Sequence, residues 1–433
     1  MSEKPITRTC GAVLPSLITY HSSLVNMTSK LTRFLLLVIL VISVVVRNPM
    51  LFLFDVIVLI IVGTSWLWGR YCLSGVSYAR RFVSDRLFFD EETDLWIEVT
   101  NAKPLPLTWL KTEDSLPLEL KLQRADWGYS PVPQHRTLLN LYSLRWYEKV
   151  RRRYRLKSER RGVFELGPVL VSSGDLFGFR TRRTELATPQ SVLVYPKIVA
   201  LEQLGLPPAR PLGDFGSTRH IIDDPLRLAG ARDYQAGDSV RFIHWKATAH
   251  RGGLQTKVFD PSSAPHWIIA LNTQTLDHLY EGVVPDFLET AIVVAASLSH
   301  AGLEARRSVG LFTNSAVRGS DRPVQLPASR HAQQAVQILE ALAQLTHPPL
   351  TPFENLLRLE GRHLPYGASV FAITPVVNTA IVSTLLDYRA KGHPVALIAI
   401  GRQPDRALIP LDLSLFVITE NWTEMKALKM VTS

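Results

Sequence analysis

Residues Gly230–Asp260, GARDYQAGDSVRFIHWKATAHRGGLQTKVFD, separate a strand-rich N-terminal half from a half in which strands and helices alternate. Asp238 precedes apolar residues that recur at helical spacing over 240–247, so we expect its carboxylate to cap a short helix. The glycine pair at 252–253 suits the end of that helix, and alternation over 254–259 predicts a strand after it. The stretch therefore predicts a turn, a helix and a strand.

The same stretch resembles the signature of the domain-of-unknown-function 58 (DUF58) family. The residues that carry the resemblance stand in the family's order and spacing: Arg232, Tyr234, Gly237, Asp238, Arg241, Ile243, Trp245, Lys246 and Ala249. The last basic position is displaced by one residue, to Arg251. Segments 160–168, 174–179 and 192–196 are also similar to those that precede the signature in this family. We interpret seven signature residues as a protein-docking surface: Arg232, Tyr234, Gly237, Asp238, Arg241, Trp245 and Lys246.

Length and composition limit the class of protein. A chain of 433 residues can form two or three domains, each with its own core. The net charge of +10 is compatible with anionic lipid, nucleic acid or an acidic partner. The two cysteines, Cys10 and Cys72, do not have metal-ligand spacing, so neither a disulfide framework nor a zinc site is expected.

Two apolar segments near the N-terminus predict a transmembrane hairpin over 31–70, after an N-terminal tail of 1–30 that starts at Met1 or Met27. They are Leu31–Val46 and Met50–Trp68, and Arg47-Asn48-Pro49 breaks the helix between them. Basic residues flank the hairpin on both outer sides, so we expect both chain termini in the cytoplasm and the protein in the inner membrane.

Residues 78–200 predict a β-sandwich, because short alternating segments such as Leu95–Val99 are separated by proline-containing breaks. Its most basic segment, Arg145–Arg161, is interleaved with aromatic residues. Three interpretations remain: a solvated or lipid-facing strand, which we favour, a protein-docking surface, and a nucleic-acid site, which we disfavour.

Residues 266–433 predict an α/β domain of Rossmann-like type, and residues 201–265 a linker that contains the signature. This half resembles a von Willebrand factor type A domain, in which a metal-ion-dependent adhesion site follows the first strand. Amides and hydroxyls replace the expected ligands here, at Asn272, Gln274 and Thr374. Divalent cations need charged oxygen ligands, so we expect this degenerate site to bind no metal.

Catalytic motifs are scarce in the sequence. It contains no nucleotide-binding loop, no nucleophile elbow and no His-Glu-x-x-His motif. The best catalytic candidates are Asp233, Asp238, His244 and His250, but structural roles as cap, ion pair and loop residue are favoured, and His220 is interpreted as a loop histidine. We also expect Trp245 to pack beneath the sheet.

These observations predict a multi-domain α+β chain: a transmembrane helical hairpin, a β-sandwich and an α/β domain. We expect a membrane-anchored, non-enzymatic scaffold without a cofactor. The family resemblance implies a MoxR-type AAA+ ATPase and a transglutaminase-like membrane protein as partners, in the assembly or remodelling of other complexes. The alternative is an envelope-related hydrolase or transferase that uses Asp238 and His244, and a nucleic-acid tether is the third possibility.

Overall fold

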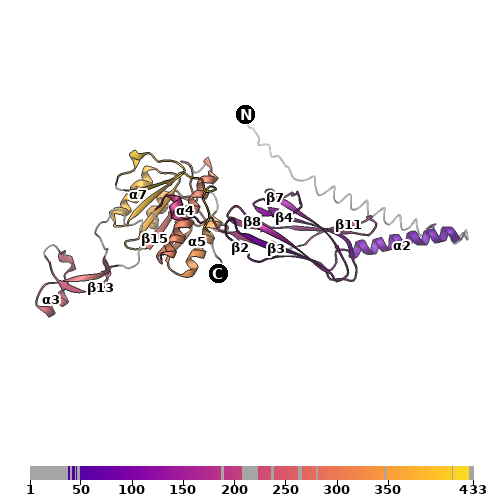
Figure 1. Cartoon of the computed structure of the whole chain (residues 1–433), viewed down its shortest axis with the longest axis horizontal. Helices are drawn as coiled ribbons and strands as arrows, with labels where there is room; N and C mark the ends of the chain where they lie inside the picture. Colours follow the sequence, from indigo (N-terminus) through magenta and orange to yellow (C-terminus); the bar gives the residue numbers. More distant parts are fainter. Residues whose placement is uncertain are drawn as a thin grey trace, which may run out of the picture.

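A computed structural model describes residues 38–39, 41–43, 45, 49–186, 190–206, 223–235, 238–261, 266–278, 281–345, 348–411 and 413–428. The parts follow one another along the long axis of the molecule (Figure 1): a helix, a strand-rich domain, an α/β domain, and a small unit that carries the signature.

Helix α2 (Pro49–Tyr71) is the one helix within the described residues with the length and apolar composition of a membrane span. It has 23 residues, more than the roughly 20 needed to cross a bilayer. It starts at the proline predicted to break the hairpin, since proline is tolerated in the first turn of a helix. Most of the first predicted span, Leu31–Val46, lies outside the described residues.

Two antiparallel sheets form the strand-rich domain. One has the order β1 (Val76–Phe82), β3 (Glu92–Asn101), β8 (Lys149–Ser158), β5 (Leu120–Leu122). The other has the order β11 (Thr181–Glu185), β10 (Val169–Gly174), β4 (Leu107–Pro117), β7 (His135–Leu144), β6 (Trp127–Tyr129). A small third sheet comprises β2 (Arg86–Leu87), β12 (Gln190–Val194) and β9 (Gly162–Leu166). The predicted strand at 95–99 lies in β3, with Leu95, Ile97 and Val99 fully buried in the core.

The basic segment of β8 forms a ladder of ion pairs with the neighbouring strand. Arg151 contacts Glu98 at 2.7 Å and Arg153 contacts Asp94 at 2.6 Å, and Lys149 also contacts Glu98, at 2.6 Å. The hydrogen bond from Lys149 is the main cause of a lowered Glu98 pKa. These basic side chains are partly exposed, so the segment is an outward strand face, one of the predicted interpretations.

The α/β domain contains a six-stranded sheet with the order β17 (Gln325–Ser329), β16 (Ser308–Thr313), β15 (His266–Leu271), β18 (Ser369–Thr374), β19 (Val395–Ile400), β20 (Ser414–Ile418). Only β17, at the edge, is antiparallel. Helices α4 (Pro285–Glu304) and α5 (Ala332–Gln344) share one core with one set of strand residues, and α6 (Phe353–Glu360) and α7 (Thr379–Ala390) share a second core with the other set. Covering both faces explains the continuous apolar runs of the parallel strands.

The segment Tyr195–Leu206 joins the two domains. Its apolar residues, including those of the 3-10 turn η1 (Leu201–Leu204), are buried in the α4 and α5 core. Polar contacts add to this junction: Arg161 contacts Glu289 at 3.0 Å, and Arg86 contacts Glu340 at 2.6 Å. The segment is therefore part of the α/β core, whereas the sequence predicted that a linker begins at residue 201.

A buried ion pair in the β-sandwich gives the first prediction. Arg80 donates to Asp114 through Nε (2.8 Å) and Nη2 (2.5 Å), and both side chains are almost fully buried. We expect Arg80→Met to lower the free energy of unfolding of this domain by about 3–5 kcal/mol, because it leaves a buried carboxylate without its partner. Hydrogen exchange of β4 and β10 in the full-length protein measures this loss.

The adjacent Arg81 supplies the control, since its side chain is 67% exposed. Arg81→Met is expected to change the opening free energy by about 1 kcal/mol at most. Equal changes in opening free energy for the two substitutions would contradict the prediction that the buried ion pair stabilises the domain more than the exposed one.

Candidate docking site

The signature residues form a small unit built on an antiparallel hairpin of β13 (Asp223–Asp233) and β14 (Gln255–Pro261). Between the strands lie a 3-10 turn, η3 (Val240–Phe242), and helix α3 (Trp245–Arg251). Figure 1 shows this unit apart from the α/β domain, at the opposite end of the molecule from α2. The sequence predicted the helix and the second strand. It missed β13, because residues 223–233 lack the alternation of a half-buried strand.

Asp238 closes the loop after β13. Its carboxylate accepts from Arg232 Nη2 at 2.6 Å, from the Gln235 amide at 3.0 Å and from Thr256 Oγ1 at 3.3 Å. The hydrogen bond from Arg232 is the main cause of a lowered Asp238 pKa. The prediction that Asp238 caps the helix is wrong: the 3-10 turn intervenes, so the carboxylate binds the loop amide of Gln235 instead. Tyr234 donates to the Asp238 carbonyl oxygen at 3.3 Å and stabilises the same loop.

His244 is the residue that caps α3. Its Nδ1 accepts from the Ala247 amide at 3.1 Å, so Nδ1 carries no proton in this arrangement. The helix ends at Gly252, whose positive φ of 69° suits glycine, as predicted. No hydrogen bond joins Asp238 to His244 in the described part of the chain. Both side chains stabilise local backbone, and the geometry does not pair them as a carboxylate and an imidazole base.

Apolar side chains of this unit are exposed. Trp245 is 68% exposed, so the prediction that it packs beneath the sheet is wrong. Trp245 is the first residue of α3, and this helix of seven residues is too short to bury the indole ring. Val240 and Phe242 on η3 are also exposed. We call Val240, Phe242 and Trp245 the signature patch.

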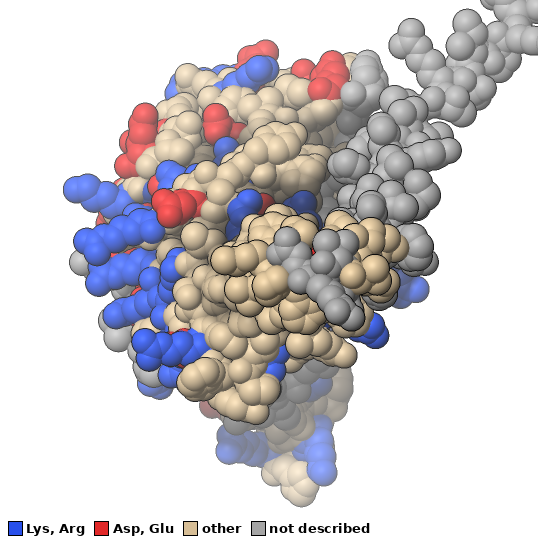
Figure 2. Space-filling view, turned by 90° about the vertical axis from the view of Figure 1, so that its right-hand side faces the viewer, with Lys and Arg blue, Asp and Glu red and all other residues tan. Residues whose placement is uncertain are grey.

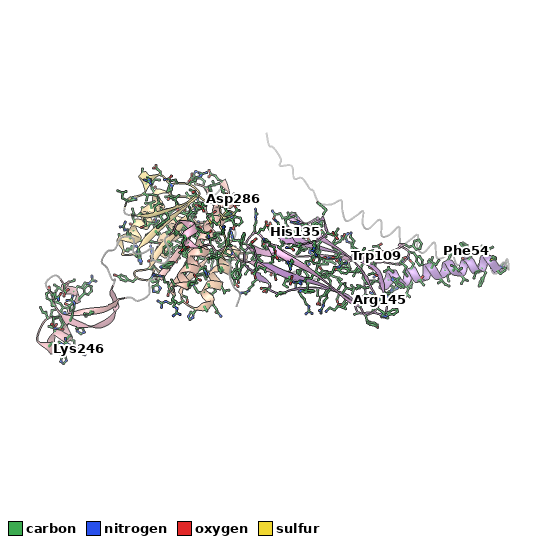
Figure 3. All side chains as sticks on the ribbon, in the orientation of Figure 1. Phe54, Trp109, His135, Arg145, Lys246 and Asp286 are labelled. Carbon is green, nitrogen blue, oxygen red and sulfur yellow. The ribbon has the colours of Figure 1, made fainter. Side chains whose placement is uncertain are left out.

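Basic residues flank the signature patch. Arg241 lies between its two η3 residues in the sequence, and Lys246 follows Trp245; both are exposed. Figure 3 labels Lys246 at the end of the unit. Of the predicted docking residues, Arg232, Tyr234 and Asp238 shape the loop, whereas Arg241, Trp245 and Lys246 present side chains to solvent. Gly237 lies outside the described residues. The sequence did not identify Val240 and Phe242, because apolar residues at helical spacing suggest a core.

The second candidate site lies where β15 and β18 end, at the point where the strand order of the sheet reverses. Parallel α/β sheets bind ligands at such a point. Asn272 follows β15 and donates to Thr374 Oγ1 at 2.9 Å, while its Oδ1 accepts from Asn314 Nδ2 at 2.8 Å and from the Gln274 amide at 3.0 Å. Asn314 also accepts from the amide and hydroxyl of Thr273.

In this network the buried side-chain amides satisfy their hydrogen-bonding groups by bonding to one another. Asn272, Asn314 and Thr374 are at most 1% exposed, and the donors and acceptors named above are paired. Gln274 points elsewhere and donates to the Leu276 carbonyl at 2.9 Å. The sequence identified Asn272 and Thr374 but missed Asn314, which follows β16 and joins them only through the sheet order. The described residues contain no group of three or more His, Cys, Asp or Glu side chains arranged to hold a metal ion.

Comparison with known proteins identifies one family. Residues 230–400 match the family described as "Protein of unknown function DUF58". A curated relative, "Uncharacterized protein YeaD" of Bacillus subtilis (strain 168), is 23% identical over 246 residues, which is 57% of this chain and 57% of that protein. The chain thus spans little more than half the length of this relative.

Similar solved structures cover only part of the chain. A CARDB domain from Pyrococcus furiosus covers 28% of this chain and 86% of its own length, with 10% identity and a TM-score of 0.19. A cohesin module from a Clostridium perfringens family 33 glycoside hydrolase covers 28% of this chain and 96% of its own length, with 10% identity and a TM-score of 0.21. At these TM-scores the likenesses carry no argument.

The amide network gives a prediction about metal. We expect titration of the full-length protein in detergent with Mg²⁺ or Mn²⁺ to give no saturable heat, because hard cations need charged oxygens and these amides bind each other. Isothermal titration calorimetry measures this, with EDTA-treated protein as the control for carried-over metal. A saturable site of defined stoichiometry that is lost in Asn272→Ala would contradict the prediction.

Proposed function

We propose that the chain, whose residues 230–400 match the DUF58 family and whose signature forms a separate unit, is a membrane-anchored, non-enzymatic scaffold that presents this unit to cytoplasmic partners. Helix α2 supports the anchoring, since it is long and apolar enough to cross a bilayer. In this proposal residues 31–70 form a hairpin of two spans in the inner membrane. Both chain termini then lie in the cytoplasm.

The proposal rests on the exposure of the Trp245 side chain. Tryptophan and arginine are enriched among the residues that dominate binding energy at protein interfaces. An indole that is two-thirds exposed beside Val240 and Phe242 gives apolar area for a partner to bury, and Arg241 and Lys246 add positive charge at its edge. An acidic rim around an apolar pocket is the complementary surface on a partner.

The partner in this proposal is a MoxR-type AAA+ ATPase, which the family resemblance implies, together with a transglutaminase-like membrane protein. The α/β domain would act as a von Willebrand factor type A-like platform. Its strand order, with an antiparallel edge strand on a parallel sheet, supports this assignment. The paired amides around Asn272 are consistent with a platform that holds partners without a bound cation.

The proposed surface predicts the effect of truncating its tryptophan. We expect Trp245→Ala to weaken capture of the ATPase by about 2 kcal/mol or more, roughly thirtyfold, because the main apolar anchor is lost. Affinity between the full-length protein in nanodiscs and the purified ATPase measures the effect. Tyr129→Ala is the control, since Tyr129 is 93% exposed on β6 in the β-sandwich. Unchanged affinity of the Trp245→Ala variant for the ATPase would show that the signature patch is not part of the interface.

The enzyme alternative uses Asp238 and His244 on an envelope-related substrate. The double variant Asp238→Asn, His244→Asn separates it from the scaffold, because asparagine still accepts hydrogen bonds in the loop and at the helix start. We expect folding, ATPase capture and the cellular phenotype to survive. A lost phenotype with intact folding and capture would favour the enzyme.

Nucleic-acid binding is not favoured, for a specific reason. Two of the basic residues that suggested it, Arg151 and Arg153 of β8, are paired with carboxylates of β3. A phosphate backbone would have to displace Glu98 and Asp94 before it could bind there.

A further inference from the structure

The loop between β10 and β11, residues 175–180, exposes a cluster of apolar side chains. Leu176 is 53% exposed, Phe177 49% and Phe179 68%. The two phenylalanine rings stack on each other, with centroids 6.0 Å apart and planes inclined by 27°. Gly178 between them has a φ of 77°, which lets the loop turn tightly and bring both rings to its tip. We call Leu176, Phe177 and Phe179 the loop tip.

This loop is attached to the side of α2. Ser65 of α2 donates from Oγ to Asp175 Oδ2, and Asp175 Oδ1 accepts from the Arg180 amide at 2.8 Å. Asp175 thus holds the loop closed and binds it to the helix. At the helix end, Arg182 donates to the Arg70 carbonyl at 3.1 Å.

The contact with Ser65 places the loop alongside the candidate span. Ser65 lies six residues before Tyr71, the last residue of α2, so it is about 9 Å from the helix end along the axis. The loop therefore overlaps the last turns of α2. The base of the loop, Asp175, is thus level with Ser65, which directly precedes Trp66 in the last turns of α2.

A second loop at this end of the β-sandwich has similar composition. The turn between β7 and β8 exposes Trp146 and Tyr147 beside the exposed Arg145. Figure 3 labels Arg145 at the end of the domain next to α2. On α2 itself, the Arg70 guanidinium lies 5.6 Å from the Trp66 ring centroid. Aromatic residues with neighbouring arginines are typical of the membrane–water interface.

We propose that the loop tip inserts into the boundary between headgroups and acyl chains of the leaflet that α2 enters, with Trp146 and Tyr147 at the same interface. The inference rests on the membrane anchoring in the proposed function. It adds a second attachment that fixes how the β-sandwich is oriented on the membrane. Figure 2, which faces the α2 end, shows mainly tan side chains nearest the viewer and Lys and Arg gathered along one side.

A bilayer fits the loop tip better than a protein partner does, because the loop adjoins the exposed apolar surface of α2. The loop is hydrogen-bonded to a helix whose own exposed residues, including Leu67 and Tyr71, need an apolar environment. Any protein covering the loop tip would have to share that space with lipid.

Depth-dependent quenching tests the inference. In full-length protein with Cys10→Ser and Cys72→Ser, an NBD fluorophore on Phe177→Cys is placed in nanodiscs of phosphatidylcholine and phosphatidylglycerol with 5-doxyl phosphatidylcholine. The same fluorophore on Ile57→Cys in α2 reports whether this helix lies in the bilayer. Tyr129→Cys reports water. Tyr129 pairs with Arg136 near the start of β7, and Arg145 follows the end of that strand, nine residues and about 30 Å further on.

We expect the probe at 177 to lose at least half its emission to the quencher, as at 57, while the probe at 129 is unaffected. Quenching at 57 with none at 177 overturns the inference and leaves anchoring intact. No quenching at 57 overturns the anchoring and the inference with it. If Phe177→Cys does not fold, Phe179→Cys takes its place.

The attachment to α2 gives a matched pair of variants. In the Phe177→Cys background we expect Asp175→Ala to reduce quenching at least twofold, because the loop loses its bonds to Ser65 and Arg180. Asp175→Asn should retain quenching, since its amide oxygen still accepts from the Arg180 amide and its NH2 group can donate to the Ser65 hydroxyl. Protection of the 177 probe only after addition of a soluble protein, with no quenching by lipid, would identify a protein-binding loop and overturn the inference.

Discussion

The packing of Tyr195–Leu206 into the α/β core is the interaction on which the arrangement of the molecule depends. Val199 donates its amide to Ser297 Oγ at 3.0 Å, inside α4. Lys197 is buried and donates to the Trp422 carbonyl at 2.8 Å, and its burial lowers the pKa of its amine. Its ammonium also lies 5.1 Å from the Phe89 ring centroid. These buried contacts pack the segment into the α/β domain, so no solvated linker separates that domain from the β-sandwich.

How much the sequence predicts depends on whether a residue's environment is set locally or by distant strands. The strand at 95–99 and the alternation of strands and helices after residue 266 are found because their apolar periodicity continues over several residues. Helix α6 was missed because eight residues give too short a pattern, and edge strand β17 because it contains a proline and little alternation. The DUF58 signature was recognised because its spacing is long and specific.

The candidate sites show the same division. The loss of charged ligands at Asn272 and Thr374 could be predicted because both lie at the ends of buried strands, Asn272 directly after β15 and Thr374 as the last residue of β18. Asn314 could not, since only the parallel pairing of β15 with β16 brings it beside Asn272. The prediction for Trp245 was wrong because large aromatic residues are usually buried, whereas α3 has only seven residues and no described element covers its first turn. A short helix in a small unit cannot bury every large side chain it carries.

The ion-pair ladder on β8 has a consequence for the electric field around the protein. Lys149 and Arg151 share the Glu98 carboxylate and Arg153 contacts Asp94, so these three cations face two carboxylates of β3 and one positive charge remains uncompensated. The carboxylates of β3 therefore reduce the positive charge of β8 but do not cancel it. The remaining charge is part of the net charge of +10, and salt at about 0.1 M screens its attraction to a phosphate-rich leaflet beyond about 10 Å.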